Sequence, residues 1–349
     1  MAKEVRYTLI GLGNIGRNLL DILVHRQAQV EADYGLRFVL VGAADSSGTA
    51  IEPAGLDPAL VRDIKLARKG VSSYPRAGRP GMKAVQMVES VQAEMLVEAS
   101  PTNLKDGEPG LGCMRTALRL GQHVVTANKG PLVLAFAELT GLARQRGCKL
   151  LYSGTVAGGL PTVNLGVRDL AGSGVVRVEG IFNGTTNYIL TRMEEERISY
   201  EQALAGAQQA GIAEADPALD VDGWDAANKL VIIANSVLKR PTKLADVAVE
   251  GIRGLTLEDL QRARASGKVI KLLVLAEKRG NDYALSVRPT ALDKDHPLAR
   301  TGKWDMGVVY HTDYMGVISA IIEEKGPVPT SAAVLRDMIN VYAGNQGGR

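Results

Sequence analysis

The stretch that decides the fold is Val5-Arg-Tyr-Thr-Leu-Ile10, followed directly by Gly11-Leu-Gly-Asn-Ile-Gly16. The first part has the pattern of a short apolar strand, the second is a G-x-G-x-x-G turn, and a helical pattern begins at Arg17. In this order, backbone N–H groups at the start of the helix can bind a pyrophosphate. We therefore predict an α/β fold with a Rossmann-type doubly wound parallel sheet. The predicted cofactor-binding residues of the turn are Gly11, Gly13, Asn14, Ile15 and Gly16.

A second apolar strand, residues 37–44, ends at Asp45. An acid at this place can bind the ribose 2′-hydroxyl of a dinucleotide. The spacing from the glycine turn is longer than usual, which we attribute to a first helix that extends to Ala32. Ser46 and Ser47 follow Asp45 where an arginine would favour NADP, so the sequence favours NAD. NADP stays open as an alternative because three basic residues follow in the next segment: Arg62, Lys65 and Arg68.

The remainder of the first half resumes the rhythm of a parallel sheet after an insertion. Residues 46–81 are rich in Gly, Pro, Ser and Arg, and we expect an irregular segment around a helix at about 58–69. Strands are predicted at 95–99 and 123–126, and Lys129 follows the second of them. Open α/β sheets bind ligands at the carboxyl ends of their strands, so Lys129 is a candidate site residue. An exposed lysine in a turn is the alternative.

The densest group of charged residues lies between Glu214 and Lys229, where sixteen residues contain five carboxylates. From Asp225 onward the pattern is that of an apolar helix, so Asp225 and Lys229 share one face. The preceding loop can bring its carboxylates together around a small polar ligand. A solvated acidic loop followed by a surface ion pair, worth about 0.3–0.5 kcal/mol, is the alternative. The acidic residues of the loop are Glu214, Asp216, Asp220 and Asp222.

Composition bounds the class of protein. With 349 residues, 46% of them hydrophobic and 23% charged, the chain suits a globular protein of two domains. A net charge of +3 without a basic block predicts neither nucleic acid nor a membrane surface as a partner. The chain starts directly with a strand, so we expect no signal sequence and a cytoplasmic protein. Cys113 and Cys148 lie in apolar patterns without metal-ligand spacing, and we expect free thiols.

Residues 153–161 form a glycine-rich segment after a predicted strand at 149–152. Its glycines free the backbone to curl, so that carbonyl groups can face an ion or amides a ligand. A crossover between two domains explains the same residues equally well.

Together these motifs resemble the homoserine dehydrogenase family. The resemblance rests on G-L-G-N-I-G at 11–16, T-A-N-K at 126–129, V-A-G-G-L-P at 156–161, N-G-T-T-N-Y-I-L at 183–190, the acidic stretch at 214–229 and P-T-S-A-A-V-L-R-D at 329–337. It implies reversible NAD- or NADP-dependent oxidation of L-homoserine to L-aspartate 4-semialdehyde, a step in threonine and methionine biosynthesis. It also implies a homodimer of the short form, without a C-terminal regulatory domain.

The resemblance also implies roles for single residues. Lys229 matches the acid/base lysine and Lys129 the lysine beside the nicotinamide. A lysine can accept the hydroxyl proton only in its neutral form, which desolvation and a neighbouring positive charge favour. The substrate-binding residues are Glu214, Asp225, Asp220 and Thr185. Further cofactor-binding residues are Ser100 and Gly326.

Two positions depart from the family pattern. In the family's sodium loop an acidic residue usually stands where this chain has Ser153, so an ion here lacks an anionic ligand. The ion's expected ligands are the backbone carbonyls of Val156, Gly158 and Leu160. Of the glycine run before the last helix only Gly326 is present, which keeps open a substrate other than homoserine among small amino or hydroxy acids. A nucleotide-sensing regulator without activity is the second alternative.

The expected architecture is discontinuous. Residues 1–150 form the nucleotide-binding domain, residues 151–320 form a substrate-binding and dimerisation domain, and a helix at 329–344 returns to the first domain. Alternating strands at 268–278 and 283–292 predict an open mixed sheet in the second domain. We predict that the apolar face of this sheet forms the dimer interface.

Overall fold

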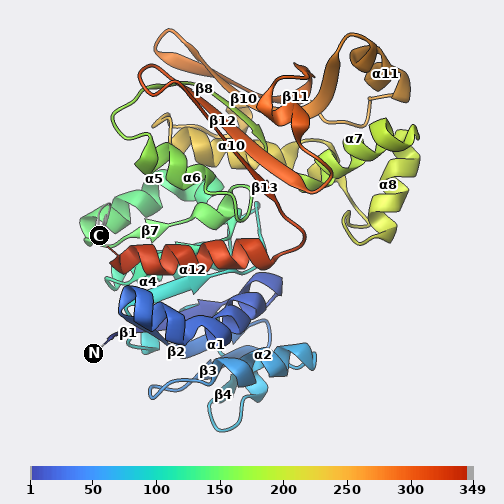
Figure 1. The fold of residues 1–349 in the computed structure, drawn as a ribbon. Helices are drawn as coiled ribbons and strands as arrows, with labels where there is room; N and C mark the ends of the chain where they lie inside the picture. The colour runs from blue at the N-terminus through green and yellow to red at the C-terminus, as the bar shows by residue number, and fades with distance from the viewer. Residues whose placement is uncertain (1, 344–349) are drawn as a thin grey trace. The chain divides into compact units, whose positions relative to one another are not determined.

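A computed structural model of the chain describes residues 2–343. The chain forms two compact units, the first of residues 1–159 and 326–349 and the second of residues 160–325. Each unit contains one sheet (Figure 1).

The sheet of the first unit has seven strands in the order β4-β3-β2-β1-β5-β6-β7. Parallel pairs join β2, β1, β5, β6 and β7, whereas β3 and β4 add to the edge in antiparallel fashion. The chain leaves β1 towards β2 and later returns to β5 on the other side of β1, so the strand order reverses there. This arrangement confirms the predicted doubly wound fold. The strands are β1 Lys3–Ile10, β2 Leu36–Asp45, β3 Gly48–Ile51, β4 Gly78–Pro80, β5 Met95–Glu98, β6 His123–Thr126 and β7 Leu150–Leu151.

The register of the parallel strands aligns their carboxyl ends. Ile10 pairs with Ala44 on one side and with Glu98 on the other, and Glu98 pairs with Thr126. The residues that follow these four positions therefore lie along one edge of the sheet, where α/β proteins bind ligands.

The helices of the first unit bury their apolar residues against this sheet. Leu19 and Leu23 of α1 share a core cluster with Tyr7 of β1 and with Val334 and Met338 of α12. Figure 1 shows α12 alongside α1, although α12 comes last in the chain. The predicted last helix, 329–344, is found at Val328–Tyr342, and residue 344 lies outside the described residues. The helices are α1 Asn14–Tyr34, α2 Pro58–Leu66, α3 Ala84–Ser90, α4 Gly110–Arg119, α5 Lys129–Gln145 and α12 Val328–Tyr342, with 3₁₀ turns at Val71–Ser73 and Ser153–Thr155.

The insertion at 46–81 is more regular than its composition predicted. It contains α2, but also β3 and β4, which extend the sheet beyond β2. The prediction of an irregular segment was wrong because two strands of four and three residues have no periodicity of their own. The hydrogen bonds of β3 with β2 and of β4 with β3 make them strands, and such partners cannot be found from local composition.

The second unit contains a six-stranded sheet in the order β13-β12-β8-β10-β11-β9. All neighbours are antiparallel except β11 and β9, so the predicted mixed sheet is confirmed. One face is buried through side chains such as Val274, Val308 and Tyr310. The strands are β8 Val175–Ile181, β9 Ala248–Val249, β10 Lys268–Arg279, β11 Asp282–Asp293, β12 Asp305–Thr312 and β13 Val317–Glu323.

The helices α7, α10 and α11 of the second unit contact β10. In the described part of the chain, residues 2–343, no helix has both the length and the apolar character that crossing a membrane requires. The helices are α6 Thr162–Asn164, α7 Gly184–Glu196, α8 Tyr200–Gln209, α9 Ala218–Val221, α10 Trp224–Ser236 and α11 Leu257–Ala265, with a π-helical turn at Leu165–Asp169 and 3₁₀ turns at Leu244–Asp246 and Pro297–Arg300.

Candidate active site

The glycine turn after β1 has three glycines with different roles. Gly11 has φ +88°, and a Cβ there would lie 2.3 Å from the main chain of Ala99. A Cβ on Gly16 would lie 2.1 Å from the carbonyl oxygen of Gly11, so the helix could not approach the turn. A Cβ on Gly13 would meet nothing within 4 Å, and Gly13 begins α1 without a capping side chain. The first N–H groups of α1 are thus available to an anion, as a pyrophosphate site requires.

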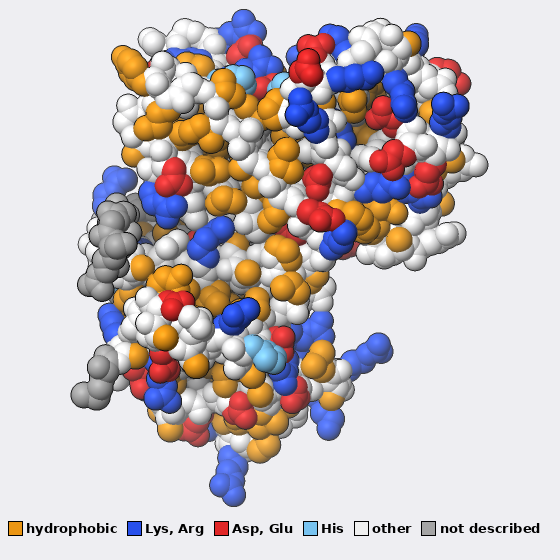
Figure 2. Space-filling view, in the orientation of Figure 1, with side chains coloured by type: hydrophobic (Ala, Val, Ile, Leu, Met, Phe, Trp, Pro, Cys, Tyr) orange, Lys and Arg blue, Asp and Glu red, His pale blue; other side chains and the backbone are white. Residues whose placement is uncertain are grey.

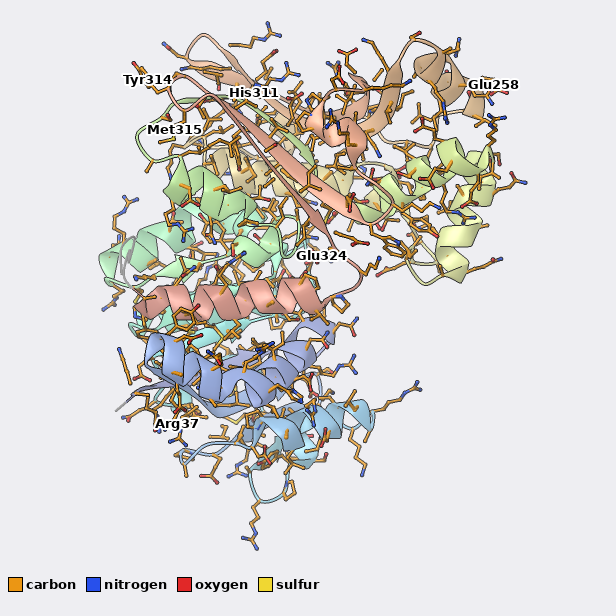
Figure 3. The ribbon with its side chains drawn as sticks, viewed as in Figure 1. Arg37, Glu258, His311, Tyr314, Met315 and Glu324 are labelled. Atoms are coloured by element: carbon orange, nitrogen blue, oxygen red, sulfur yellow. The ribbon has the colours of Figure 1, made fainter. Side chains whose placement is uncertain are left out.

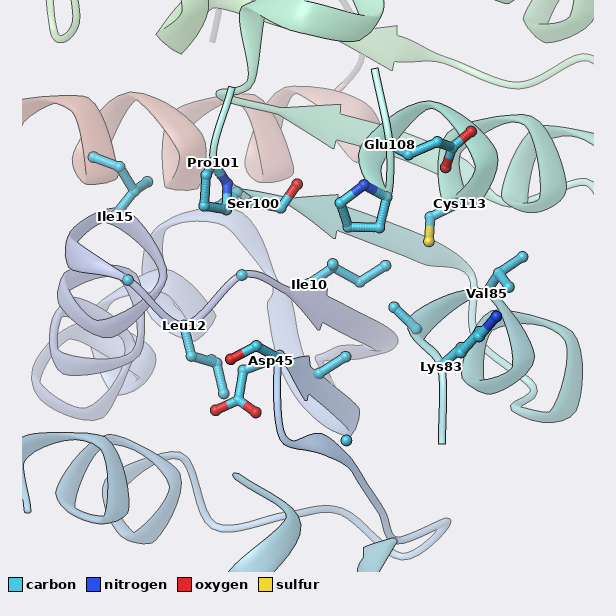
Figure 4. Close-up of a pocket in the computed structure, with 18 of the residues that line it drawn as sticks. Ile10, Leu12, Ile15, Asp45, Lys83, Val85, Ser100, Pro101, Glu108 and Cys113 are labelled. Atoms are coloured by element: carbon cyan, nitrogen blue, oxygen red, sulfur yellow. The ribbon is translucent and has the colours of Figure 1, made fainter. Parts of the chain in front are cut away.

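A cavity of about 1050 Å³ opens at the carboxyl edge of this sheet. Figure 4 shows Asp45 on one side of the glycine turn and Ser100 and Pro101 on the other. Among the described residues, the predicted Gly16, Lys129 and Gly326 do not line this cavity. The predicted residues that line it are Gly11, Gly13, Asn14, Ile15, Asp45 and Ser100. Its size and its position at the reversal of strand order fit a dinucleotide.

The carboxylate of Asp45 accepts hydrogen bonds from other residues of the first unit. Its Oδ1 accepts hydrogen bonds from the backbone N (2.8 Å) and Oγ (2.6 Å) of Ser47. Its Oδ2 accepts from Lys65 Nζ at 2.5 Å and from the backbone N of Val71 at 3.0 Å. Burial alone would raise the pKa of Asp45, but the hydrogen bonds from Lys65, Ser47 and Val71 lower it below its usual value. A ribose hydroxyl would therefore meet an acid that is ionised and already paired with a lysine.

Of the three basic residues considered for a 2′-phosphate, the structure brings Lys65 to Asp45. Both line the cavity, and the side chain of Lys65 is 20% exposed. Arg62 instead forms ion pairs with Asp21 and Asp63, at 2.7 and 2.9 Å. Of these three basic residues, Lys65 is thus the one that forms an ion pair with Asp45.

Lys129 lies at the same edge of the sheet, as the first residue of α5 directly after β6. The preceding Asn128 caps this helix, since its Oδ1 accepts a hydrogen bond from the backbone N of Gly130 at 3.0 Å. The backbone of Lys129 therefore lies between the end of a buried strand, β6, and the capped first turn of α5.

In the second unit, Lys229 and Asp225 form a buried pair on α10. Lys229 Nζ donates to Asp225 Oδ2 at 2.7 Å and to the carbonyl oxygen of Phe182 at 2.5 Å. The side chains are only 12% and 7% exposed, so the alternative of a solvated surface pair is wrong. Asn183 Nδ2 donates to Asp225 Oδ2 at 2.9 Å and to Asp220 Oδ1 at 2.7 Å. Asn183 therefore brings two of the predicted carboxylates together beside the lysine.

The pKa of Asp220 is raised. Burial and the charge of Asp225 cause this shift, while the hydrogen bond from Asn183, the charge of Lys229 and the Thr185 hydroxyl oppose it. The one hydroxyl proton of Thr185 is shared between Asp220 and the carbonyl oxygen of Ile212, which lies 3.3 Å from Oγ1. Carboxylates that interact in this way are common in binding and catalytic sites.

Asp216 and Asp222 of the loop do not join this group, which corrects the sequence prediction. Asp222 forms an ion pair with Arg253, and Asp216 accepts a hydrogen bond from the backbone N of Ala218 at 3.1 Å. Glu214 is exposed, and within residues 2–343 its carboxylate has no hydrogen bond or ion pair. Short loops place side chains on different sides, and sequence spacing alone could not show which of them face Lys229.

Comparison with known proteins accounts for these features. The family model described as homoserine dehydrogenase matches residues 161–339. A homoserine dehydrogenase of Methanocaldococcus jannaschii is 36% identical over 334 residues, which cover 96% of this chain and 97% of the relative. This chain belongs to the homoserine dehydrogenase family.

Two further relatives of this homoserine dehydrogenase family member extend the comparison. An NAD(+)-dependent homoserine dehydrogenase of Pseudomonas canavaninivorans is 36% identical over 341 residues, covering 97% of this chain and 96% of the relative. The crystal structure of a putative homoserine dehydrogenase from Archaeoglobus fulgidus has a TM-score of 0.88 and 37% identity, covering 97% of this chain and all of that one.

Ser153, which departs from the homoserine dehydrogenase pattern, is bound by a carboxylate from elsewhere in the chain. Asp337 of α12 accepts hydrogen bonds from the backbone N and the Oγ of Ser153, at 2.7 and 2.6 Å. Among the described residues, no three His, Cys, Asp or Glu side chains gather as a metal site. The chain passes from the first unit to the second after Gly159. A sodium ion on the carbonyls of Val156, Gly158 and Leu160 stays a prediction.

Three residues with buried hydrogen-bonded side chains were not singled out as site residues from the sequence: Glu98, Asn183 and Asp337. Two of them left a signal. Asn183 begins the N-G-T-T motif, where it caps α7. Glu98 is the one charged residue in the otherwise apolar strand Met95–Glu98, which is buried throughout. A charge inside a buried parallel strand indicates a specific partner.

Proposed function

We propose that this protein catalyses the reversible oxidation of L-homoserine to L-aspartate 4-semialdehyde with a nicotinamide cofactor. The observation that supports it best is the buried Lys229–Asp225 pair, which Asn183 joins to Asp220. A lysine amine next to two carboxylates suits a substrate that carries both an ammonium group and a hydroxyl group. Family membership makes homoserine the first substrate to test.

The residues of the second unit supply acid/base chemistry and substrate binding. Nζ of Lys229 accepts the hydroxyl proton of homoserine as the carbon–oxygen double bond forms, and returns it in the reverse reaction. The carboxylates of Asp225 and Glu214 pair with the substrate ammonium, and Asp220 and Thr185 add hydrogen bonds. A nicotinamide bound at the first unit would supply the acceptor for the hydride of the alcohol carbon. Lys129, in the first unit, acts beside the nicotinamide by its charge, as the family resemblance implies.

The cofactor is held by the first unit, with NAD preferred and NADP accepted. The glycine turn from Gly11 to Gly16 binds the pyrophosphate through N–H groups, and Ser100 binds further along the cavity wall. The carboxylate of Asp45 accepts a hydrogen bond from the ribose 2′-hydroxyl of NAD, while Lys65 beside it can pair with the 2′-phosphate of NADP. The NAD(+)-dependent relative from Pseudomonas canavaninivorans supports the preference for NAD.

The activity is tested by a panel of small amino and hydroxy acids, each supplied with NAD and with NADP, with NAD(P)H formation followed by absorbance. Homoserine should give the highest kcat/KM. Turnover of homoserine no better than that of its neighbours would contradict the assignment and point to another small amino or hydroxy acid.

We further propose that the protein acts as a cytoplasmic homodimer. The outer face of β12 and β13 carries Val317 and Ile321, which are 61% and 45% exposed. Figure 2 shows hydrophobic side chains gathered over this sheet, and Figure 3 shows Tyr314 and Met315 at the tip of the hairpin. A second copy would cover such a face. The free thiols of Cys113 and Cys148 fit a reducing compartment.

A further inference from the structure

Glu98, at the carboxyl end of β5, is a fully buried carboxylate that the proposed chemistry does not use. It lies in the middle of the first sheet, between Ile10 of β1 and Thr126 of β6. Burying a charge costs several kcal/mol unless hydrogen bonds replace the water it loses. The hydrogen-bond partners of Glu98 therefore indicate which function its carboxylate serves.

These partners come from the segments that follow two neighbouring strands. Oε1 of Glu98 accepts hydrogen bonds from the backbone N of Ser100, at 2.8 Å, and from its Oγ. Oε2 accepts from Thr126 Oγ1 at 3.0 Å. One carboxylate thus ties the segment after β5 to the end of β6.

Asn128 closes the network into a ring. Its backbone N donates to Thr126 Oγ1 at 3.0 Å, and its Nδ2 donates to Ser100 Oγ at 3.3 Å. Its Oδ1 caps α5 through the backbone N of Gly130. Lys129 lies between Asn128 and Gly130 in the chain. Its backbone is therefore held in place by the hydrogen-bonded ring that includes Glu98.

Helix α4 covers the ring without leaving room for a side chain. A Cβ on Gly110 would lie 3.0 Å from Asn128 Nδ2 and 3.1 Å from Glu98 Oε1. On the other side, Ser100, Pro101 and Ala127 form part of the cavity wall. The ring therefore lies directly behind the part of the wall that a cofactor would touch.

Burial disfavours a charge on Glu98, whereas its hydrogen-bond partners favour one. Burial raises the pKa of Glu98, and the hydrogen bonds from Ser100, Thr126 and Asn128 oppose this shift without cancelling it. Every polar neighbour is nevertheless arranged as a donor, which suits the ionised form. A charge kept at a cost to stability is characteristic of functional sites.

We propose that Glu98 is a positioning residue, whose carboxylate holds Ser100 in place at the wall of the cofactor cavity and holds the backbone of Lys129 at the same edge of the sheet. The inference rests on the proposed roles of Ser100 and Lys129. It assigns Glu98 no contact with substrate or cofactor.

The test is Glu98→Gln, which keeps the shape but replaces one acceptor by an NH₂ group that faces the Asn128 amide or the Ser100 donors. We expect the Kd for NADH, measured by fluorescence titration, to rise about tenfold, as when one buried acceptor is lost. The kcat for homoserine should fall as well, while Tm stays the same or rises because a buried charge is removed. Gly141→Ala in α5 is the control, since a Cβ there meets nothing within 4 Å.

The double variant Glu98→Gln, Asn128→Asp separates positioning from mere packing. The new carboxylate at 128 can still cap α5, and its second oxygen can accept from the new amide at 98. We expect the Kd for NADH to return to within about threefold of the wild type, because each donor again faces an acceptor.

Two results would overturn the proposal. One is an unchanged Kd and kcat in Glu98→Gln, and the other is a joint fall of Tm and affinity that the double variant does not rescue. If the wild type bound NADH without oxidising homoserine, the proposed function would fail, but NADH affinity would still decide the role of Glu98.

Discussion

Among single residues, substitution by arginine should affect the activity differently at Lys229 and at Lys129. Lys229→Arg keeps the charge beside Asp225, but a guanidinium does not release its proton in the working range of pH. We expect kcat to fall by about 10²–10⁴-fold, the usual contribution of general acid–base catalysis. The Kd for NAD should stay unchanged, because Lys229 belongs to the second unit. Steady-state kinetics and NAD titration measure both quantities.

Lys129 provides the comparison. If it acts by charge and position, Lys129→Arg retains more activity than Lys129→Ala. Near-normal turnover of Lys229→Arg, with an unchanged pH profile, would make Lys229 a structural cation and Lys129 the leading candidate for the base.

Asp45 and Lys65 should have opposite effects on cofactor preference. Asp45→Ala removes the acceptor of the ribose hydroxyl and frees Lys65, so NAD binding should weaken by about 1.5–3 kcal/mol while NADP binding weakens less or improves. Lys65→Met should weaken NADP more than NAD. The Kd values of both cofactors for both variants test this pair, and equal losses for NAD and NADP would place the discriminating residues elsewhere.

The raised pKa of Glu98 predicts how stability depends on pH. A carboxyl group whose pKa is higher in the folded protein binds its proton more tightly there. Its stabilising contribution is present below the ordinary value of 4.5 and is lost as the pH rises through the raised value. The nearby thiol of Cys113 does not titrate in this range, because burial and then the charge of Glu98 raise its pKa to about 12. Relative to Glu98→Gln, the wild type should lose stability as the pH rises above 4.5.

Urea unfolding of both proteins across this range measures the difference. A difference in unfolding free energy that did not change with pH would mean that Glu98 does not change its protonation there.

At the scale of elements, a buried carboxylate of α12 forms hydrogen bonds with another segment of the first unit. Asp337 accepts two hydrogen bonds from Ser153, whose backbone N would lose its acceptor in Asp337→Ala. An unsatisfied buried donor costs about 1–3 kcal/mol, and the free energy of unfolding should fall by at least that amount. Ala332→Ser, at an exposed position of the same helix, is the control and should have little effect. Equal stability of the two variants in urea unfolding would show that α12 is held by its apolar face alone.

For the whole molecule, we expect the outer face of β12 and β13 to determine whether the protein is a monomer or a dimer. Ile321→Glu places a charge in the middle of the proposed interface, so the protein should change from dimer to monomer at micromolar concentration. Leu66→Glu, at an apolar residue that is 60% exposed on α2, is the matched control and should leave the dimer intact. Size-exclusion chromatography with light scattering gives the mass of each variant. Wild type and Ile321→Glu of equal mass would place the interface, if one exists, on another face.

The sequence by itself determined the features that depend on neighbouring residues. The glycine turn and Asp45 predicted the doubly wound sheet, because a strand, a tight turn and a helix N-terminus are local structures. The four-residue spacing of Asp225 and Lys229 predicted one helix face, and the two side chains form an ion pair there. Alternation at 268–278 and 283–292 predicted β10 and β11 to within one residue.

Tertiary structure alone decided which distant residues meet. Asp45 with Lys65, Asp220 with Asn183, Glu98 with Thr126 and Ser153 with Asp337 are separated by 20 to 184 residues. Each pair forms only after strands and helices have packed, since the chain between the partners sets no geometry for them. The strands β3 and β4 were missed for the same reason, because β3 is defined by its pairing with β2 and β4 by its pairing with β3, and not by their own short sequences. Local pattern specifies the elements, whereas the partners of a buried charge depend on packing between elements, which sequence spacing does not encode.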